Sequence, residues 1–378
     1  MLKQAMIGPK AYISIDKLKS NLNSIKKKVG PLDILCVIKA NGYGHGAIAV
    51  AKAVSNFSNI HFGVFSISEA LELRQASITN DIMIFSKMQF DIIDDAFNNN
   101  IILNLSSFDD IEYLKTYISE TKNKPRYHIK FDTGMTRLGV DIDKADLFYE
   151  KLAKDIKVQP EGIYTHFATA DEGDLEYANN QLSKFKDVIS SADKYNIKFK
   201  YIHATNSGAI LNLQESYFNM IRVGMLLYGA LPSNEVPKNI KLKPVMSYCG
   251  SIVNIRRVPK DTNISYGGMY QTKNDTNIGV IQTGFADGFP RPWFKNGYIC
   301  YKGQQYKIAG RICMDQLMVD FGETNPRLGD DVLFFGEDSN GHIPIENIAE
   351  AISSTVYVLL TSIGGRTEYI YKNDKTII

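Results

Sequence analysis

The sequence predicts an α/β protein, a (β/α)8 TIM-type barrel followed by a mainly β C-terminal domain. In the first part of the chain, short apolar runs alternate with segments of helical periodicity, which is typical of a parallel sheet covered by helices. About eight such runs fall within roughly 220 residues, as a (β/α)8 barrel requires. After about residue 236, helical segments become rare and alternating strand-like runs dominate, which indicates a second domain of a different kind.

The predicted barrel covers residues 11–235 and begins with a helix. Asp16 can cap this helix, which carries Leu18, Leu22 and Ile25 on one face. The later helices are expected over 47–55 and 69–74, and the strands over 34–38, 63–66, 82–85, 101–104, 128–131, 162–166, 201–203 and 221–224.

The predicted second domain covers residues 236–378, and residues 1–10 are expected to pack on it. Pro344 opens its one clear helix, over 346–352. Prolines mark the boundary between the domains, at positions 232, 237 and 244. The strand-like runs of this domain are 251–256, 277–283, 298–301, 306–308 and 316–321.

Composition and charge exclude several classes of function. The chain has 378 residues, of which 44% are hydrophobic, and this suits a folded protein of about two domains. A formal net charge of +2 gives no broad attraction to nucleic acid. No apolar run is long enough to span a membrane, and residues 1–10 lack the apolar core of a signal peptide. The four cysteines form no CxxC pair, so we expect no metal site, no disulfides and a reducing, cytoplasmic setting.

Lys39 stands directly after the apolar run 34–38 and before a glycine-rich turn. An amine at the mouth of a buried strand is partly desolvated, which lowers its pKa. The neutral amine is a nucleophile toward carbonyl groups and can form a Schiff base. Gly42, Gly44 and Gly46 let the backbone turn sharply and approach a ligand. The alternative interpretation is a lysine whose stem lies along apolar surface before an ordinary turn.

Polar residues also follow the later strand-like runs, and a barrel gathers its active-site residues at the carboxyl ends of its strands. Lys130 and Arg137 belong to one such segment, His166 and Asp171 to the next, and His203 to a third. A lone histidine is more often a hydrogen-bonded core residue than a catalyst. The joint placement of these residues nevertheless favours a site.

The segments 206–208 and 222–225 follow the last predicted strands, where barrel enzymes often bind phosphate. Ser207 offers a hydroxyl, and Gly224 leaves room for a ligand to approach backbone donors. The chain has no P-loop pattern, so nucleotide binding is not indicated.

In the second domain, three segments that contain glycines stand out as turns, 264–268, 283–291 and 309–316. The first of them presents Tyr266 where a strand passes into a turn. Taken alone, Tyr266 is more simply a core or interface tyrosine.

Together, these segments resemble the motifs of alanine racemases, a family of enzymes that use pyridoxal 5'-phosphate (PLP). At least six motifs occur in the family's order, from about Tyr12 to Tyr371. The chain departs from the usual pattern at Gly42, where the family has Ala, at Thr136, where it has Gly, and at Val358, where it prefers Glu.

The resemblance implies that PLP is the cofactor and that Lys39 holds it covalently. Arg222 then faces the pyridine nitrogen with His203 in support, and His166 contacts the ring. The residues that match the phosphate site are Tyr43, Ser207, Gly224, Met225 and Tyr357.

The resemblance also assigns the substrate contacts. Arg137 and the backbone N–H of Met314 match the residues that hold the substrate carboxylate. Lys130 matches a residue that is carbamylated in some members and then pairs with the arginine. The polar entrance corridor and its supporting residues match Asp171, Arg291, Arg311 and Asp315, with Phe285 where the family usually has Tyr.

The implied activity is interconversion of L-alanine and D-alanine by two bases, with Lys39 and Tyr266 on opposite faces of Cα. In the family, the residues that match Tyr266, Met314 and Asp315 come from the partner subunit, which implies a homodimer with shared active sites. The usual role is supply of D-alanine for peptidoglycan. Two other functions stay open: a PLP racemase of serine or of broad specificity, raised by Phe285, and a PLP-binding protein that is not an enzyme.

Overall fold

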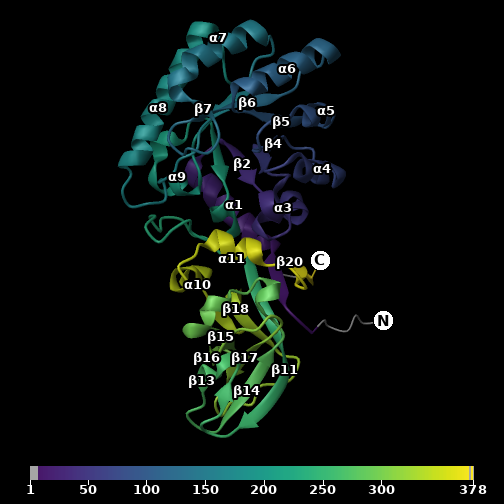
Figure 1. Ribbon diagram of the computed structural model, residues 1–378, viewed down its shortest axis with the longest axis vertical. Helices are drawn as coiled ribbons and strands as arrows, with labels where there is room; N and C mark the ends of the chain where they lie inside the picture. Colours follow the sequence, from purple (N-terminus) through teal and green to yellow (C-terminus); the bar gives the residue numbers. More distant parts are fainter. Residues whose placement is uncertain (1–6, 374–375, 378) are drawn as a thin grey trace.

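The computed structural model describes residues 7–373 and 376–377, and it consists of two bodies stacked along the long axis of the molecule (Figure 1). The upper body is a barrel of strands surrounded by helices, and the lower body is built mainly of strands. Two short helices, α10 (Ile345–Ala351) and α11 (Val356–Ser362), lie between them. The expectation for residues 1–6 falls outside the described residues.

Eight parallel strands form a nearly closed barrel in the order β10-β2-β3-β4-β5-β6-β8-β9, which confirms the predicted fold class. The seam lies between β9 and β10, where Arg222 N donates a hydrogen bond to Thr205 O at 3.0 Å. The strands are β2 (Asp33–Val37), β3 (Ile60–Val64), β4 (Ile82–Ile84), β5 (Ile101–Leu105), β6 (Tyr127–Asp132), β8 (Gly162–Tyr164), β9 (Tyr201–His203) and β10 (Met220–Val223).

Alternation along these strands separates two cores. Ile34 and Cys36 of β2 belong to the large core that contains the apolar faces of the helices, whereas Leu35 belongs to a separate small cluster. Because successive side chains of a strand point to opposite faces, this cluster is the barrel interior. Its buried members come from six strands, and they are Leu35, Met83, Ile102, Tyr164, Tyr201 and Met220.

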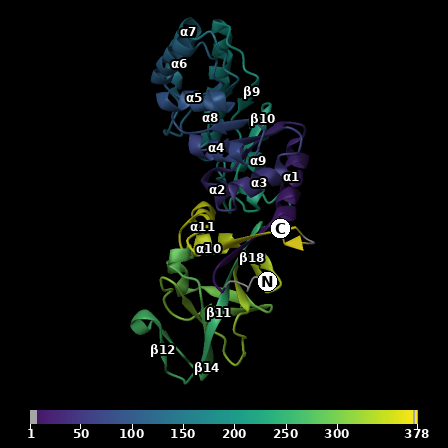
Figure 2. The same cartoon turned by 90° about the vertical axis from the view of Figure 1, so that its right-hand side faces the viewer.

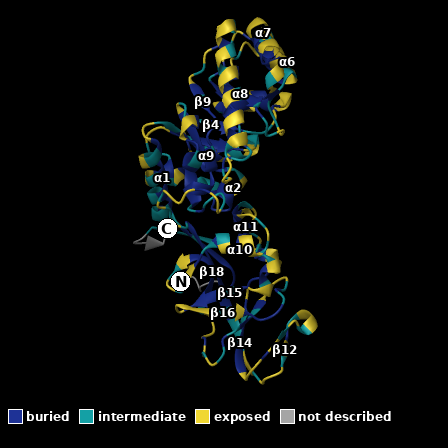
Figure 3. Ribbon diagram, turned by 90° about the vertical axis from the view of Figure 1, so that its left-hand side faces the viewer, coloured by how far each residue is buried: buried dark blue, intermediate teal, exposed yellow. Residues whose placement is uncertain are grey.

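The helices cover the outside of the barrel, and the outer faces of the long helices are exposed (Figure 3). The first helix begins two residues earlier than expected: Ser14 is its N-cap and accepts a hydrogen bond from Lys17 N at 3.2 Å, while Asp16 lies inside the first turn. Asp16 is therefore not the cap. The helices on the barrel are α1 (Ile15–Val29), α3 (Ala47–Val54), α4 (Ile67–Gln75), α5 (Ile93–Asn98), α6 (Phe108–Thr121), α7 (Ala145–Asp155), α8 (Glu176–Ala192) and α9 (Ser207–Asn212).

The lower body is a ten-stranded sheet in the order β19-β18-β15-β16-β17-β14-β11-β1-β20-β21, and β18 also pairs with β11. Strand β1 comes from the N-terminal part of the chain, so the sheet ties both ends of the sequence together. The strands are β1 (Lys10–Ser14), β11 (Met246–Val258), β14 (Thr276–Ile281), β15 (Tyr298–Tyr301), β16 (Gln304–Ile308), β17 (Leu317–Asp320), β18 (Asp331–Asp338), β19 (Gly341–Ile343), β20 (Glu368–Asn373) and β21 (Thr376–Ile377).

A small hairpin of β12 (Asn263–Ile264) and β13 (Tyr270–Gln271) projects from the far end of this sheet (Figure 2). Figure 2 also shows that the hairpin lies far from the barrel of its own chain. Across the described residues, no helix is both long enough and apolar enough to cross a membrane.

Candidate active site

A cavity of about 720 Å³ opens at the carboxyl ends of the barrel strands. It is lined by residues that follow several different strands, and helix α11 adds Tyr357, Val358 and Thr361 to its wall. The sequence analysis did not predict this helix. The predicted site residues that line the cavity are Lys39, Tyr43, Lys130, Arg137, His166, Asp171, Ser207, Arg222, Gly224, Met225 and Tyr357.

The floor of the cavity is formed by side chains that lie two residues further along a strand than residues of the barrel interior. In β6, His128 precedes Lys130, and in β10, Met220 precedes Arg222, so each pair shares one face of its strand. Met220 belongs to the interior cluster of the barrel. Lys130 and Arg222 therefore lie one layer nearer to the carboxyl ends than the apolar interior does.

Lys39 opens a left-handed turn directly after β2. Ala40, Asn41 and Gly42 have φ values of 51°, 53° and 63°, and Tyr43 follows with φ 52°. A left-handed conformation costs roughly 1 kcal/mol or more for each residue that carries a Cβ. Local hydrogen bonds hold the turn, because Gly42 N donates to Ile38 O at 2.8 Å and Asn41 Oδ1 accepts from Ala47 N at 3.0 Å. Such strain is found where function fixes the backbone.

The amine of Lys39 is half-buried at the edge of the cavity. Burial lowers its pKa, and the charge of Arg137 lowers it further, while Glu69 acts in the opposite direction. The carboxylate of Glu69 is bound by backbone donors: it accepts hydrogen bonds from Ala40 N at 2.8 Å and Phe65 N at 2.6 Å. A lowered pKa increases the fraction of the Lys39 amine that is neutral and nucleophilic.

Arg222 is almost completely buried, at 3% exposure. Its guanidinium donates to three backbone carbonyls and to two histidine ring nitrogens, and none of these acceptors is a carboxylate. The ring acceptors are Nδ1 of His203 and Nδ1 of His166, both at 3.1 Å. Burial lowers the pKa of Arg222 to about 10, so the group keeps its charge at neutral pH.

The contact with Arg222 also determines the tautomer of His203 and, through His203, that of His128. Because the guanidinium can only donate, Nδ1 of His203 carries the lone pair and Nε2 carries the proton. Nε2 of His203 then donates to Nδ1 of His128 across 3.0 Å. Burial lowers the pKa of both histidines, in the case of His128 to about 3, and both are neutral. Sequence analysis missed His128, although its position two residues before Lys130 was a usable signal.

Lys130 is buried next to other cations. Burial lowers its pKa to about 8, and the charges of Arg137 and Arg222 add to this effect, whereas Asp132 opposes it. Its ammonium nitrogen lies 5.6 Å from the centre of the Tyr164 ring, and the Arg222 guanidinium carbon lies 5.5 Å from the same ring. The floor of the cavity is therefore strongly positive.

Hydroxyls and glycines gather at the other end of the cavity. Gly224 N donates to Ser207 Oγ at 3.1 Å, and a Cβ on Gly224 would stand 2.9 Å from the Tyr43 hydroxyl. Gly208 packs as closely, because a Cβ there would stand 2.7 Å from Asp171 N. The rings of Tyr43 and Tyr357 have centres 6.0 Å apart. This end suits an anion that accepts hydrogen bonds.

A second group of predicted residues lies on the lower body and does not reach the cavity of its own chain. Tyr266 begins the short η6 turn (Tyr266–Gly268) between β12 and β13 and is 66% exposed, and Met314 is 56% exposed. Neither lines the cavity. Backbone hydrogen bonds join the Phe285 loop to the Met314 loop, with Ala286 N donating to Met314 O at 3.0 Å.

Charged residues surround this second group. The Arg291 guanidinium carbon lies 5.7 Å from the centre of the Phe285 ring, and Ser265 Oγ donates to Arg311 O at 2.7 Å. Asp315 pairs with Arg366 at 2.8 Å. The structure therefore keeps these residues together, but a single chain does not bring them to Lys39. Arg366 was missed by sequence analysis, since only the fold brings it beside Asp315.

Two family models match the chain. The model of the alanine racemase N-terminal domain matches residues 13–232, and that of the alanine racemase C-terminal domain matches residues 245–371. The chain belongs to the alanine racemase family. The resemblance drawn from the motifs is thus confirmed.

Relatives of known name agree with this assignment to the alanine racemase family. Alanine racemase 2 of Caldanaerobacter subterraneus subsp. tengcongensis is 35% identical over 362 residues, which cover 95% of this chain and 93% of the relative. The solved alanine racemase of Clostridium difficile 630 superposes with a TM-score of 0.92 at 32% identity, covering 99% of this chain and 98% of that one. The alanine racemase of Bartonella henselae, solved with covalently bound pyridoxal phosphate, gives a TM-score of 0.86 at 27% identity, covering 97% and 100%.

Proposed function

We propose that this protein interconverts L-alanine and D-alanine with PLP as its cofactor. The observation that carries the proposal is Lys39, an amine with a lowered pKa at the end of a barrel strand, beside a cavity with a positive floor and a hydroxyl-lined end. The names and full-length coverage of the relatives support alanine as substrate over serine, and an enzyme over a passive carrier.

The residues of the cavity fit PLP. Lys39 supplies the amine that the aldehyde requires. Gly224 brings its backbone close to the hydroxyls of Tyr43 and Ser207, where a Cβ would collide with the Tyr43 hydroxyl. Arg222 and His203 would meet the pyridine nitrogen, and His166 the ring. The phosphate would be held by hydroxyls and backbone donors from Tyr43, Ser207, Gly224, Met225 and Tyr357.

When bound, PLP withdraws electrons from the substrate and acidifies its Cα proton. Arg222 moderates this effect, because a guanidinium holds its own protons and leaves the pyridine nitrogen without one. Arg137 would hold the substrate carboxylate together with the backbone N–H of Met314. These contacts fix Cα in one orientation, so that each face meets one base.

The two bases are Lys39 and Tyr266. The Lys39 amine takes the proton from one face of Cα and returns it there in the reverse reaction. The Tyr266 hydroxyl does the same on the opposite face. Racemisation results when one residue removes the proton and the other supplies one.

Tyr266 would come from the partner subunit of a homodimer. Its exposure, and that of Met269 at 57% and Met314 at 56%, leaves an apolar surface around the η6 turn that a partner barrel would cover. The dimer would thereby complete each active site. A cytoplasmic location and the supply of D-alanine for peptidoglycan belong to the same proposal, and they rest on family resemblance.

Chemical trapping tests the proposal. The purified protein is loaded with PLP, reduced with borohydride and digested, and the modified peptide is identified by mass spectrometry. We expect the modification on Lys39 and none on Lys130, which lines the same cavity and serves as an internal control. Loss of the α-deuterium from both enantiomers of deuterated alanine should accompany it. Modification of Lys130 in place of Lys39, or a protein that retains the α-deuterium, contradicts the proposal.

A further inference from the structure

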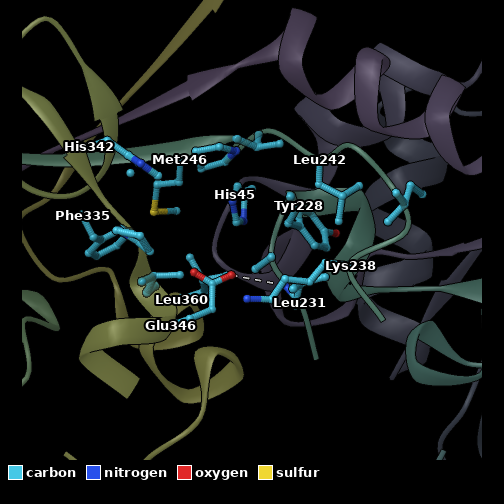
Figure 4. A pocket seen from close by; sticks show the side chains of 18 residues that line it. His45, Tyr228, Leu231, Lys238, Leu242, Met246, Phe335, His342, Glu346 and Leu360 are labelled. Carbon is cyan, nitrogen blue, oxygen red and sulfur yellow. Dashed lines mark hydrogen bonds between the residues drawn. The ribbon is translucent and has the colours of Figure 1, made fainter. Parts of the chain in front are cut away.

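A second cavity, of about 280 Å³, lies between the barrel and the lower body (Figure 4). One side of it is formed by His45, which follows the Lys39 turn, and by Tyr228. Met246 and Phe335 from the sheet form the other side, and Leu360 from α11 closes it. No step of the proposed reaction uses this cavity.

His45 presents an unused acceptor to this space. The side chain is completely buried, and its Nδ1 lies 2.9 Å from Tyr43 O. A carbonyl only accepts, so Nδ1 carries the proton and Nε2 carries a lone pair. Among the described residues, no group donates to Nε2. Burial lowers the pKa of His45 to about 4, so the ring stays neutral at physiological pH.

The rest of the lining is mainly apolar and aromatic. The Tyr228 ring stacks on the His45 ring with centres 4.5 Å apart, and the Tyr228 hydroxyl is already engaged, since it donates to Val37 O at 3.1 Å. Glu346 Oε1 accepts from Leu231 N at 3.3 Å. An occupant must therefore bring one hydrogen-bond donor for His45 and an otherwise apolar, flat body.

We propose that this cavity is a binding site for a small, uncharged aromatic molecule with one hydroxyl or N–H group, which donates to His45 Nε2. The volume of about 280 Å³ suits a ligand built on one or two rings. Such a ligand lies beside His45 and places its ring against the apolar lining from Met246, Phe335 and Leu360. The exposed side chains of Lys238 and His342 stand among the lining residues.

The site lies directly behind the Lys39 turn. The Tyr228 and Tyr43 rings have centres 5.1 Å apart, and Tyr43 lines the large cavity. Gly44 packs against α11 so closely that a Cβ there would stand 2.2 Å from Leu360 O. The turn and α11 thus form the wall between the two cavities. Binding in the small cavity does not depend on racemisation.

Phenol and anisole are the matched probes, because anisole keeps the ring and the oxygen but has no donor. Their binding to the PLP-loaded protein is measured by titration calorimetry in saturating alanine, which occupies the large cavity. We expect phenol to bind about five- to tenfold more tightly than anisole, the effect of one net hydrogen bond. Equal affinities, or no phenol binding at millimolar concentration, overturn the proposal.

Two variants locate the bound probe. His45→Phe keeps the ring and removes the acceptor, so the preference for phenol should disappear. Leu242→Trp, at a half-buried lining position, fills the cavity and should abolish binding of both probes. Circular dichroism checks that each variant is folded, and Leu242→Trp serves if His45→Phe does not fold. Undiminished phenol binding to Leu242→Trp contradicts the proposal.

Discussion

Arg222 donates a hydrogen bond to Nδ1 of His203 across 3.1 Å, and this single contact orders a chain of neutral imidazoles that ends at His128. A guanidinium that is 3% exposed is thereby held by acceptors that do not neutralise it. Its direction is fixed while its positive charge remains available to the cavity. This arrangement suits a site that binds an anionic cofactor and must keep a proton away from one of its atoms.

Replacement of His203 by Phe should destabilise the protein. The ring is kept, but Arg222 loses an acceptor and Nδ1 of His128 loses its donor, both in buried surroundings. We expect the free energy of unfolding to fall by about 2 kcal/mol. Urea unfolding of the PLP-free protein measures this. Tyr164→Phe provides the comparison: Tyr164 stacks on His203 with ring centres 4.9 Å apart, and its hydroxyl donates to Asn104, away from the guanidinium. A smaller loss for His203→Phe than for Tyr164→Phe contradicts the expectation.

Replacement of Arg222 by Glu should change the reaction rather than simply slow it. A carboxyl group at this position can share a proton with the pyridine nitrogen, which makes the cofactor a stronger electron sink. We expect slower racemisation and a rise in transamination, seen as release of pyruvate from alanine. Arg222→Gln is the matched control, since it removes the charge and has no acidic proton. Equal pyruvate release by the two variants counts against the proposed role of Arg222.

Replacement of Tyr266 by Phe should affect the two directions of the reaction unequally. If Tyr266 serves one face of Cα, loss of its hydroxyl should slow α-deuterium release from one enantiomer by at least about 100-fold and from the other enantiomer much less. Tyr270→Phe is the control from the same hairpin, because the Tyr270 hydroxyl donates to Asp320 at 2.5 Å and does not face a substrate site. Equal slowing with both enantiomers contradicts the two-base assignment.

The stability of the PLP-free protein should rise with pH between about 8 and about 10.5 because of Lys130. Burial, with the charges of Arg137 and Arg222, lowers its folded-state pKa to about 8, whereas an unfolded lysine titrates near 10.4. Between these values the unfolded state binds more protons, so the free energy of unfolding increases as pH rises.

The size of this rise should be about 3 kcal/mol, because each pKa unit between about 8 and about 10.4 is worth about 1.4 kcal/mol, and Lys130→Met should remove it. Urea unfolding in buffers free of carbon dioxide measures it, because carbamylation would remove the charge of the amine. The same slope in Lys130→Met and in the unmodified protein would assign the effect to other groups.

Local sequence patterns predicted much of the fold. The apolar run before Lys39 and the glycines after it indicated a strand that ends in a tight turn, and the structure has both. The positions of Lys130 and Arg222 at the ends of apolar runs also placed them near one end of the barrel. The left-handed turn was not predictable in detail, because Asn41 and Gly42 favour φ values near 50° but Ala40, which begins it, does not.

Features that depend on distant contacts were missed. Helix α11 lines the large cavity because it packs on the Lys39 turn, where Gly44 lies against Leu360, and these segments are far apart in the sequence. The role of His128 depends on His203, 75 residues later. Tyr266 illustrates the limit most clearly: its motif was recognisable, but one chain does not bring it to Lys39. In the proposed dimer its place depends on a second copy.

Heterodimers test the central claim, a site shared by Lys39 of one chain and Tyr266 of the other. Two differently tagged variants, Lys39→Ala and Tyr266→Phe, are co-expressed and the mixed dimer is purified; the control joins an unmodified chain to a chain that carries both changes. A shared site predicts about half of the unmodified activity in the first dimer, which has one intact site, and almost none in the control, in which each site lacks one base. The reverse result, an inactive first dimer and a half-active control, would show that each chain works with its own two residues and would contradict the account.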